Sequence, residues 1–101
     1  MEDRYYIGTE LKFAFTITAD GFDMDTDDYE ITLSCGGKRL SVPKEDIVDG
    51  EDGHYLLVDT SQFPSGTLRM VVTAQVPDDD FGDGMRAEVA ALDLCIIQHP
   101  W

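Results

Sequence analysis

The feature that most constrains this fold is a period of two in the apolar residues. In the run TLRMVVTAQV, every second side chain from Leu68 to Val76 is apolar, and most of those between are polar. Successive side chains of a β-strand point to opposite faces of a sheet, so this pattern predicts a strand with one buried face. The period of 3.6 that an amphipathic helix needs is hard to find in the chain. The sequence therefore predicts an all-β protein.

Other runs complete a set of about seven strands with turn signals between them. Gly36-Gly37 predicts a tight hairpin, because both central positions of a type I′ turn need positive φ. Short strands at this spacing are typical of a β-sandwich, and we expect one antiparallel, immunoglobulin-like domain over residues 1–101. The other expected strands are Arg4–Ile7, Leu11–Thr18, Tyr29–Cys35, Lys38–Val42, His54–Asp59 and Arg86–Ile97.

The apolar positions of these runs predict the core. In the last run the inward parity changes between Val89 and Leu92, which predicts a β-bulge near Ala90-Ala91. Cys35 and Cys95 occupy inward positions, and we expect buried free thiols, although the pair could form one bridge. The expected core comprises Phe13, Phe15, Ile17, Ile31, Leu33, Leu57, Met70, Val72, Val89, Leu92 and Leu94.

The segment DTSQFPSG, from Asp59 to Gly66, interrupts the strands and predicts a helical turn that Pro64 and Gly66 stop. Placed between an apolar strand and a long strand, it resembles the crossing between the fifth and sixth strands of many bacterial and phage immunoglobulin-like modules. The chain as a whole is similar to small proteins of phage tails, baseplates and prophage-like elements of gut bacteria. That resemblance implies a structural or adhesive module with no catalytic residues.

Charge excludes several partners. Seven Lys and Arg against 21 Asp and Glu give a net charge of −14. Nucleic acid and anionic membranes would repel such a chain, so we expect a protein partner or self-assembly instead. The N-terminal MEDRYYIGTE has no apolar signal-peptide region. We therefore expect the protein in the cytoplasm or assembled into a virion-like particle.

Most of the acidic residues fall in three connections, at residues 19–28, 43–53 and 77–84. Alternate connections of an up-and-down succession lie at the same end of a sandwich, so we expect these three to converge. Three interpretations remain open: solvated turns, a basic docking partner, or a calcium site built from several loops. The candidate calcium ligands are Asp23, Asp25, Asp27, Asp78, Asp79, Asp80 and Asp83.

Known motifs do not decide among these interpretations. Asp23-x-Asp25-x-Asp27 copies the opening of an EF-hand loop, but Asp28 replaces its sixth-position glycine and Ser34 its twelfth-position glutamate. No other cofactor is expected.

LLVDTS, which contains Asp59, resembles the active-site triplet of aspartic proteases, whose chemistry needs two aspartates that share a proton. In that family the triplet comes early and a hydrophobic-hydrophobic-Gly segment follows much later. Here Asp59 lies past the middle of the chain, and Ile96-Ile97 is followed by Gln98. We therefore expect a non-enzymatic structural or interaction module, with a soluble calcium-responsive binding domain as the alternative.

Overall fold

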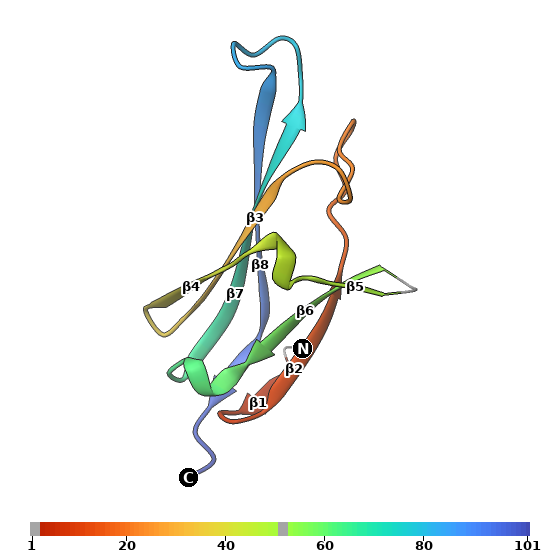
Figure 1. The fold of residues 1–101 in the computed structure, drawn as a ribbon. Coiled ribbons are helices and arrows are strands. Elements are labelled where there is room, and N and C mark those ends of the chain that lie inside the picture. The colour runs from red at the N-terminus through yellow and green to blue at the C-terminus, as the bar shows by residue number, and fades with distance from the viewer. Residues whose placement is uncertain (1–2, 51–52) are drawn as a thin grey trace.

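The computed structural model describes residues 3–50 and 53–101 and consists of two β-sheets (Figure 1). The larger sheet has the strand order β1-β8-β7-β3-β4, and the smaller has the order β2-β6-β5. The predicted all-β class is confirmed. The strands are Arg4–Tyr6 (β1), Glu10–Phe15 (β2), Tyr29–Cys35 (β3), Lys38–Val42 (β4), Val48–Gly50 (β5), Gly53–Asp59 (β6), Gly66–Pro77 (β7) and Met85–Gln98 (β8).

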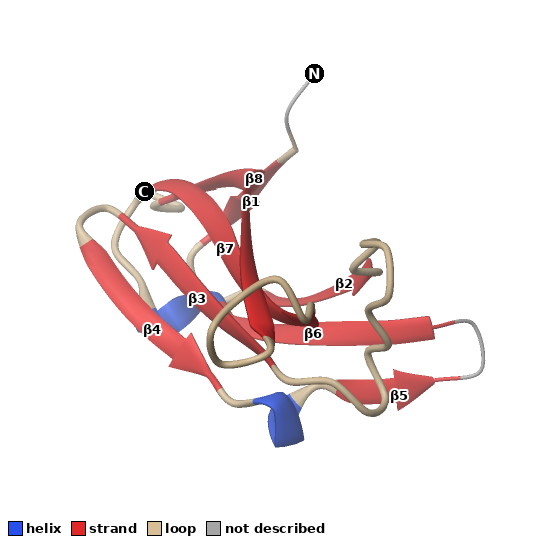
Figure 2. Ribbon diagram, turned by 90° about the horizontal axis from the view of Figure 1, so that it is seen from above, coloured by secondary structure: helices blue, strands red, loops and turns tan. Residues whose placement is uncertain are grey.

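Two details differ from the expected seven antiparallel strands. The described residues form eight strands, because the three residues of β5 pair with β6 in a hairpin (Figure 2). Three residues are too few to display an alternation, so this strand has no signal of its own in the sequence. In addition, β1 lies parallel to β8, with Arg4 beside Ile96, and the larger sheet is therefore mixed.

The predicted turns are confirmed. Gly36 and Gly37 both have positive φ, at 58° and 88°, and join β3 to β4. A short 3₁₀ helix, η2, spans Thr60–Gln62, and a second one, η1, spans Lys44–Asp46. Thr60 is fully buried and ties the crossing to the start of the chain, since its hydroxyl donates to the Thr9 carbonyl at 2.7 Å.

The core lies between the two sheets, where alternate residues of β3 and β7 face the inner residues of β6. Ile31, Leu33 and Met70 are buried as predicted, and Val72 is buried beside them. Phe13, Phe15, Ile17 and Leu94 are partly buried and pack against this core. The full buried set also contains Met24, Tyr29, Cys35, Leu56, Val58, Phe63, Leu68, Ala74, Val76, Cys95 and Ile97.

The predicted burial of Leu57 is wrong. Leu57 is 55% exposed, because β6 pairs with β2 in a register that places it opposite Lys12. Residues directly opposite each other in an antiparallel pair share a face. Phe13 and Leu11 face the core, so their partners Leu56 and Val58 face it as well, and Leu57 lies on the outer face.

The predicted burial of Val89 and Leu92 is also wrong. Val89 lies opposite Thr73 on the outer face of the larger sheet and is 67% exposed. Leu92 lies opposite buried Met70, on the inner face as expected, yet it is 56% exposed. The smaller sheet does not extend over this part of β8, so the correct facing does not produce burial.

The β-bulge predicted near Ala90-Ala91 lies further along the strand. The pairing of β7 with β8 changes register between Leu68, which faces Cys95, and Arg69, which faces Asp93. Leu94 is therefore the extra residue. The bulge changes which residues of β8 face inward. Even-numbered residues face the core side before it, and Cys95 and Ile97 are inward and buried after it.

Cys35 and Cys95 are free and buried, as predicted. They lie on β3 and β8, which flank β7 on its two sides. Two strand spacings separate their backbones by about 10 Å. A disulfide needs a Cα separation below about 7 Å, so this arrangement does not allow a bridge within the chain.

Candidate functional site

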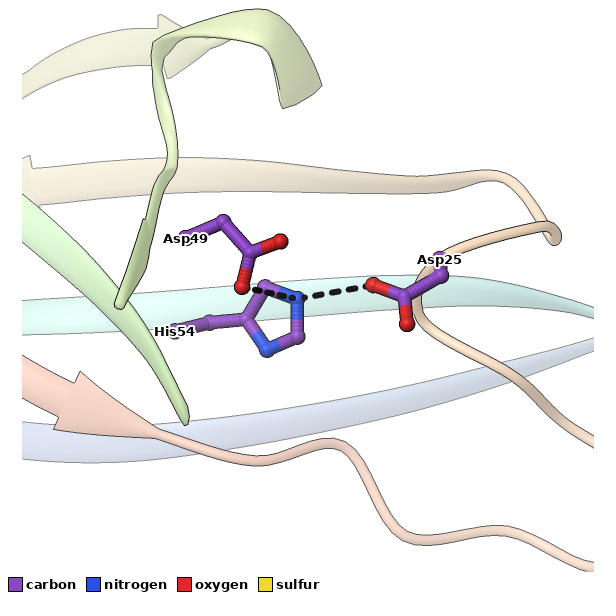
Figure 3. Close-up of side chains that lie close together, drawn as sticks. All are labelled: Asp25, Asp49 and His54. Atoms are coloured by element: carbon purple, nitrogen blue, oxygen red, sulfur yellow. Dashed lines mark ion pairs between the residues drawn. The ribbon is translucent and has the colours of Figure 1, made fainter. Parts of the chain in front are cut away.

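Two of the three acidic connections meet on one side of the smaller sheet. The connection from β2 to β3 contacts the segment that contains η1 and β5, where the Lys44 ammonium donates to the Asp27 carbonyl at 2.8 Å. The same two connections bring Asp25 near Asp49 (Figure 3). The third connection is the tip of the β7–β8 hairpin, which projects beyond the rest of the molecule (Figure 1). Glu51 and Asp52, in the second connection, lie outside the described residues.

His54 lies at the centre of this region. Its Nε2 atom is 3.3 Å from Oδ1 of Asp25 and 3.9 Å from Oδ1 of Asp49. Figure 3 shows the imidazole ring between the two carboxylates. The pairing of β5 with β6 positions two of the three residues, because Asp49 lies directly opposite His54. The histidine side chain is 18% exposed, while both carboxylates reach into solvent.

This trio has the chemistry of a possible cation site. Among residues 3–50 and 53–101, it is the only group of three or more Asp, Glu, His or Cys side chains whose ligand atoms lie within 4.8 Å of one another. It offers one imidazole nitrogen and two carboxylate oxygens. Such a mixed set suits zinc and similar transition metals, whereas calcium prefers oxygen ligands alone. Without a metal, protonated His54 would form ion pairs with both carboxylates.

Of the seven candidate calcium ligands, only Asp25 belongs to this trio. Several others form turns. Oδ2 of Asp27 accepts from the Asp23 amide at 2.9 Å, and Oδ1 of Asp78 accepts from the Asp80 amide at 3.0 Å. Oδ1 of Asp83 accepts from the Met85 amide at 3.1 Å. Asp79 and Asp80 are exposed in the hairpin tip.

The sequence predicted the strand that contains His54 but not the three-residue β5 that carries Asp49. Only two residues separate the two strands, so the approach of Asp49 to His54 is local once β5 forms. Asp25 could not be included in the same way, because its position depends on how a long connection folds back onto the sheet. That connection is held by tertiary contacts, among them the Gln75 amide that donates to the Asp28 carbonyl at 2.9 Å.

The local electrostatic potential affects the pKa of Tyr29, which is buried next to the trio. Burial raises the pKa of Tyr29 above its ordinary value, and the negative charges of Asp25 and Asp49 raise it further. Lys44 lies 5.4 Å from the centre of the Tyr29 ring and supplies a nearby positive charge. The two carboxylates therefore give this region a negative potential, which Lys44 partly offsets.

Asp59 forms the cap of a turn. Its Oδ1 accepts from the Ser61 hydroxyl at 2.6 Å and from the Ser61 amide at 3.0 Å. Both hydrogen bonds hold the pKa of Asp59 below its usual value, and the hydroxyl contributes more. This arrangement accounts for the Asp-Thr-Ser sequence, because the aspartate begins η2.

A second feature is an open groove of about 570 Å³ between β2 and the β7–β8 hairpin. Phe15 and Ile17 line one side of the groove, and Leu92 and Ala90 line the other. Alternate residues of β7 form its floor. The lining is mostly apolar, and Glu88 is its charged residue.

The chain matches no protein-family model, and no curated protein or solved structure is significantly similar to it. Within the part of the chain that the structure describes, neither helix is long or apolar enough to cross a membrane.

Proposed function

We propose that this chain is a non-enzymatic interaction module with an immunoglobulin-like arrangement, of the kind used in phage tails, baseplates and prophage-type particles. The strand order supports the immunoglobulin-like part. β8-β7-β3-β4 corresponds to the order G-F-C-C′ of such domains, and β2-β6-β5 corresponds to B-E-D. In this comparison β8 is strand G, and β1 is an edge strand that lies parallel to it.

The observation that carries the proposal is the uneven distribution of charge on a small β scaffold. Two acidic connections contact each other around Asp25 and Asp49, and an acidic hairpin tip projects beyond them. Gathering carboxylates in this way costs stability through mutual repulsion. A basic surface on a protein partner would offset that repulsion and would be attracted from a distance, which accelerates association. We infer that the acidic side docks onto such a surface within a larger assembly, in the cytoplasm or in a virion-like particle.

The test of this function is whether the chain resides in an assembly. Particles released by cells that carry the gene are purified on a density gradient and analysed by quantitative mass spectrometry. We expect the chain in the particle fraction at a fixed ratio to the major structural protein. A chain that is found only among free proteins, at no fixed ratio to any particle component, would contradict the proposal.

A second candidate function is cation binding, and the Asp25–Asp49–His54 trio favours it. The ligand atoms are close enough to share one ion, and the histidine is held by the central strand of the smaller sheet. The nitrogen ligand changes the expected metal from calcium to zinc or a similar ion. The oxygen-only alternative remains calcium at the hairpin aspartates Asp78, Asp79, Asp80 and Asp83, and the two alternatives are separated by the metal titration described below.

A further inference from the structure

The groove between β2 and β8 has the form of a missing strand. Register places Leu92, Ala90 and Glu88 of β8 opposite Met70, Val72 and Ala74 of β7, all on the inner face of the larger sheet. The three β7 residues are buried. Their three β8 partners are exposed, although they face the side on which the smaller sheet lies. The apolar face of the larger sheet is therefore wider than the layer that covers it.

One wall of the groove is the free edge of β8, and the other is formed by the end of β2 and the three residues that follow it. Within the described residues, β2 pairs only with β6, on the side away from the groove. β8 pairs with β7 along its length, and β1 covers its other edge only from Ile96 onward. The segment from Met85 to Asp93 thus presents backbone N–H and C=O groups that no described strand satisfies. Natural sheets protect such edges with charge, proline or a covering segment.

The β8 edge carries little of this protection. Between Met85 and Asp93 the sequence is MRAEVAALD, which has no proline, and its three charged side chains form ion pairs with one another or with Asp78 and Arg69. Glu88 itself is paired, because Arg86 Nη1 lies 2.9 Å from its carboxylate. An edge of this kind is suited to pairing with an added strand through main-chain hydrogen bonds, while alternate side chains enter the apolar groove.

We propose that this groove binds an extended segment of a partner protein, which adds a β-strand along β8 with apolar residues at every second position and basic residues at its end. The proposal deepens the interaction role proposed above and rests on it. The added strand would cover Leu92 and Ala90 with apolar side chains.

The basic character of the partner follows from the charges around the groove. Beyond Glu88 the groove leads to the hairpin tip with Asp78, Asp79, Asp80 and Asp83, and its other wall continues into the acidic connection that begins at Asp20. Lysine or arginine at the end of the added strand would lie between these two acidic segments. A second copy of this chain is disfavoured as the donor, since each copy carries a net charge of −14.

The experiment uses a synthetic probe. The probe is a peptide of alternating valine and threonine, with lysines at both ends so that its direction need not be known. Matched peptides carry glutamate in place of lysine, or proline at the centre. Binding to the full chain is measured by titration calorimetry at low and high salt, and hydrogen exchange reports which amides the peptide protects.

The chain supplies a matched pair of variants. Leu92 and Leu57 are almost equally exposed, at 56% and 55%, but only Leu92 lines the groove. We expect Leu92→Lys to weaken binding of the lysine peptide at least about tenfold and Leu57→Lys to leave it unchanged. The glutamate and proline peptides should also bind at least about tenfold more weakly. Amides between Met85 and Asp93 should gain protection in the complex.

Three results would overturn the inference. The lysine peptide fails to bind at millimolar concentration, the two leucine variants behave alike, or the wild-type chain forms dimers that Leu92→Lys dissolves, in which case a second copy occupies the groove. These outcomes are separable from the proposed function. A chain that is present in purified particles but does not bind the peptide keeps its role in an assembly and loses only this mode of docking.

Discussion

β7 and β8 are neighbouring strands of the larger sheet, yet most of β8 lies in a different environment from β7. β7 alternates buried and less buried residues from Leu68 to Val76. β8 is exposed at almost every position from Met85 to Asp93 and becomes buried only at Cys95 and Ile97. The two strands are hydrogen-bonded residue by residue, so the sheet itself does not cause the difference. The cause is the second layer, which covers β7 and the end of β8 but not the start of β8.

The prediction with the largest expected effect tests this difference with one substitution on each strand. Leu68 is completely buried on β7, whereas Leu92 is more than half exposed on β8. Leu68→Ala should lower the free energy of unfolding by about 2–5 kcal/mol, because it leaves a cavity in the core. Leu92→Ala should cost less than about 1 kcal/mol. Urea unfolding followed by circular dichroism measures both values, and equal losses would mean that β8 is covered in solution.

The second prediction uses the covered end of β8. Burial raises the pKa of Cys95 from 9.0 to about 11, with smaller contributions from Cys35 and Asp3. The folded state therefore favours the neutral thiol, and this stabilisation is complete below pH 9 and is lost as the pH rises toward 11. The loss should be roughly 2–3 kcal/mol for the two-unit difference.

The free energy of unfolding, measured in urea at several pH values between 8 and 11, tests this loss. Its decrease with pH gives the slope of stability against pH. Cys95→Ala should remove most of it, whatever its effect at neutral pH. A smaller slope should remain in that variant, because burial also raises the pKa values of Cys35 and Tyr29. An unchanged slope in Cys95→Ala would show that the thiol is accessible to water.

The third prediction compares the two acidic regions, the trio on the body and the hairpin tip. If the trio binds zinc, a tenfold excess of free zinc over the dissociation constant should add about 1.4 kcal/mol to the free energy of unfolding. In a domain of this size, that raises the melting temperature by several degrees. Calcium chloride and sodium chloride at equal ionic strength should change the melting temperature equally, because both act only by screening the carboxylates.

The controls separate the two metal hypotheses. His54→Gln should abolish the zinc shift, and the double variant Asp79→Asn with Asp80→Asn should retain it. A calcium-specific shift that disappears in the double variant would instead establish the oxygen-only site at the hairpin. Equal responses to all salts would leave both acidic regions as solvated loops.

The same two strands explain how much the sequence could predict. Alternation gave the correct face for Met70, Val72 and Leu92, because facing follows from the local pleat. It could not give the burial of Leu92, since burial depends on a layer formed by distant residues. The His54 group is a similar case. The pairing of Asp49 with His54 is local, whereas the approach of Asp25 depends on a connection held by tertiary contacts.

The smallest expected effect concerns the turn at Asp59, where local prediction succeeded. Hydrogen bonds from Ser61 lower the pKa of Asp59, so its stabilising contribution is present above the ordinary aspartate pKa of 3.8 and is lost as the pH falls through the lowered value. Asp59→Ala should fold normally and melt slightly below the wild type at pH 7, and the difference should shrink in acid. Asp59→Asn should lie between the two, because asparagine also caps helices. Thermal melts at pH 7 and pH 3 measure this difference. Peptidase activity in the wild type that vanished in Asp59→Asn would show instead that the aspartate is catalytic, since loss of a cap alone leaves a folded protein with its chemistry intact.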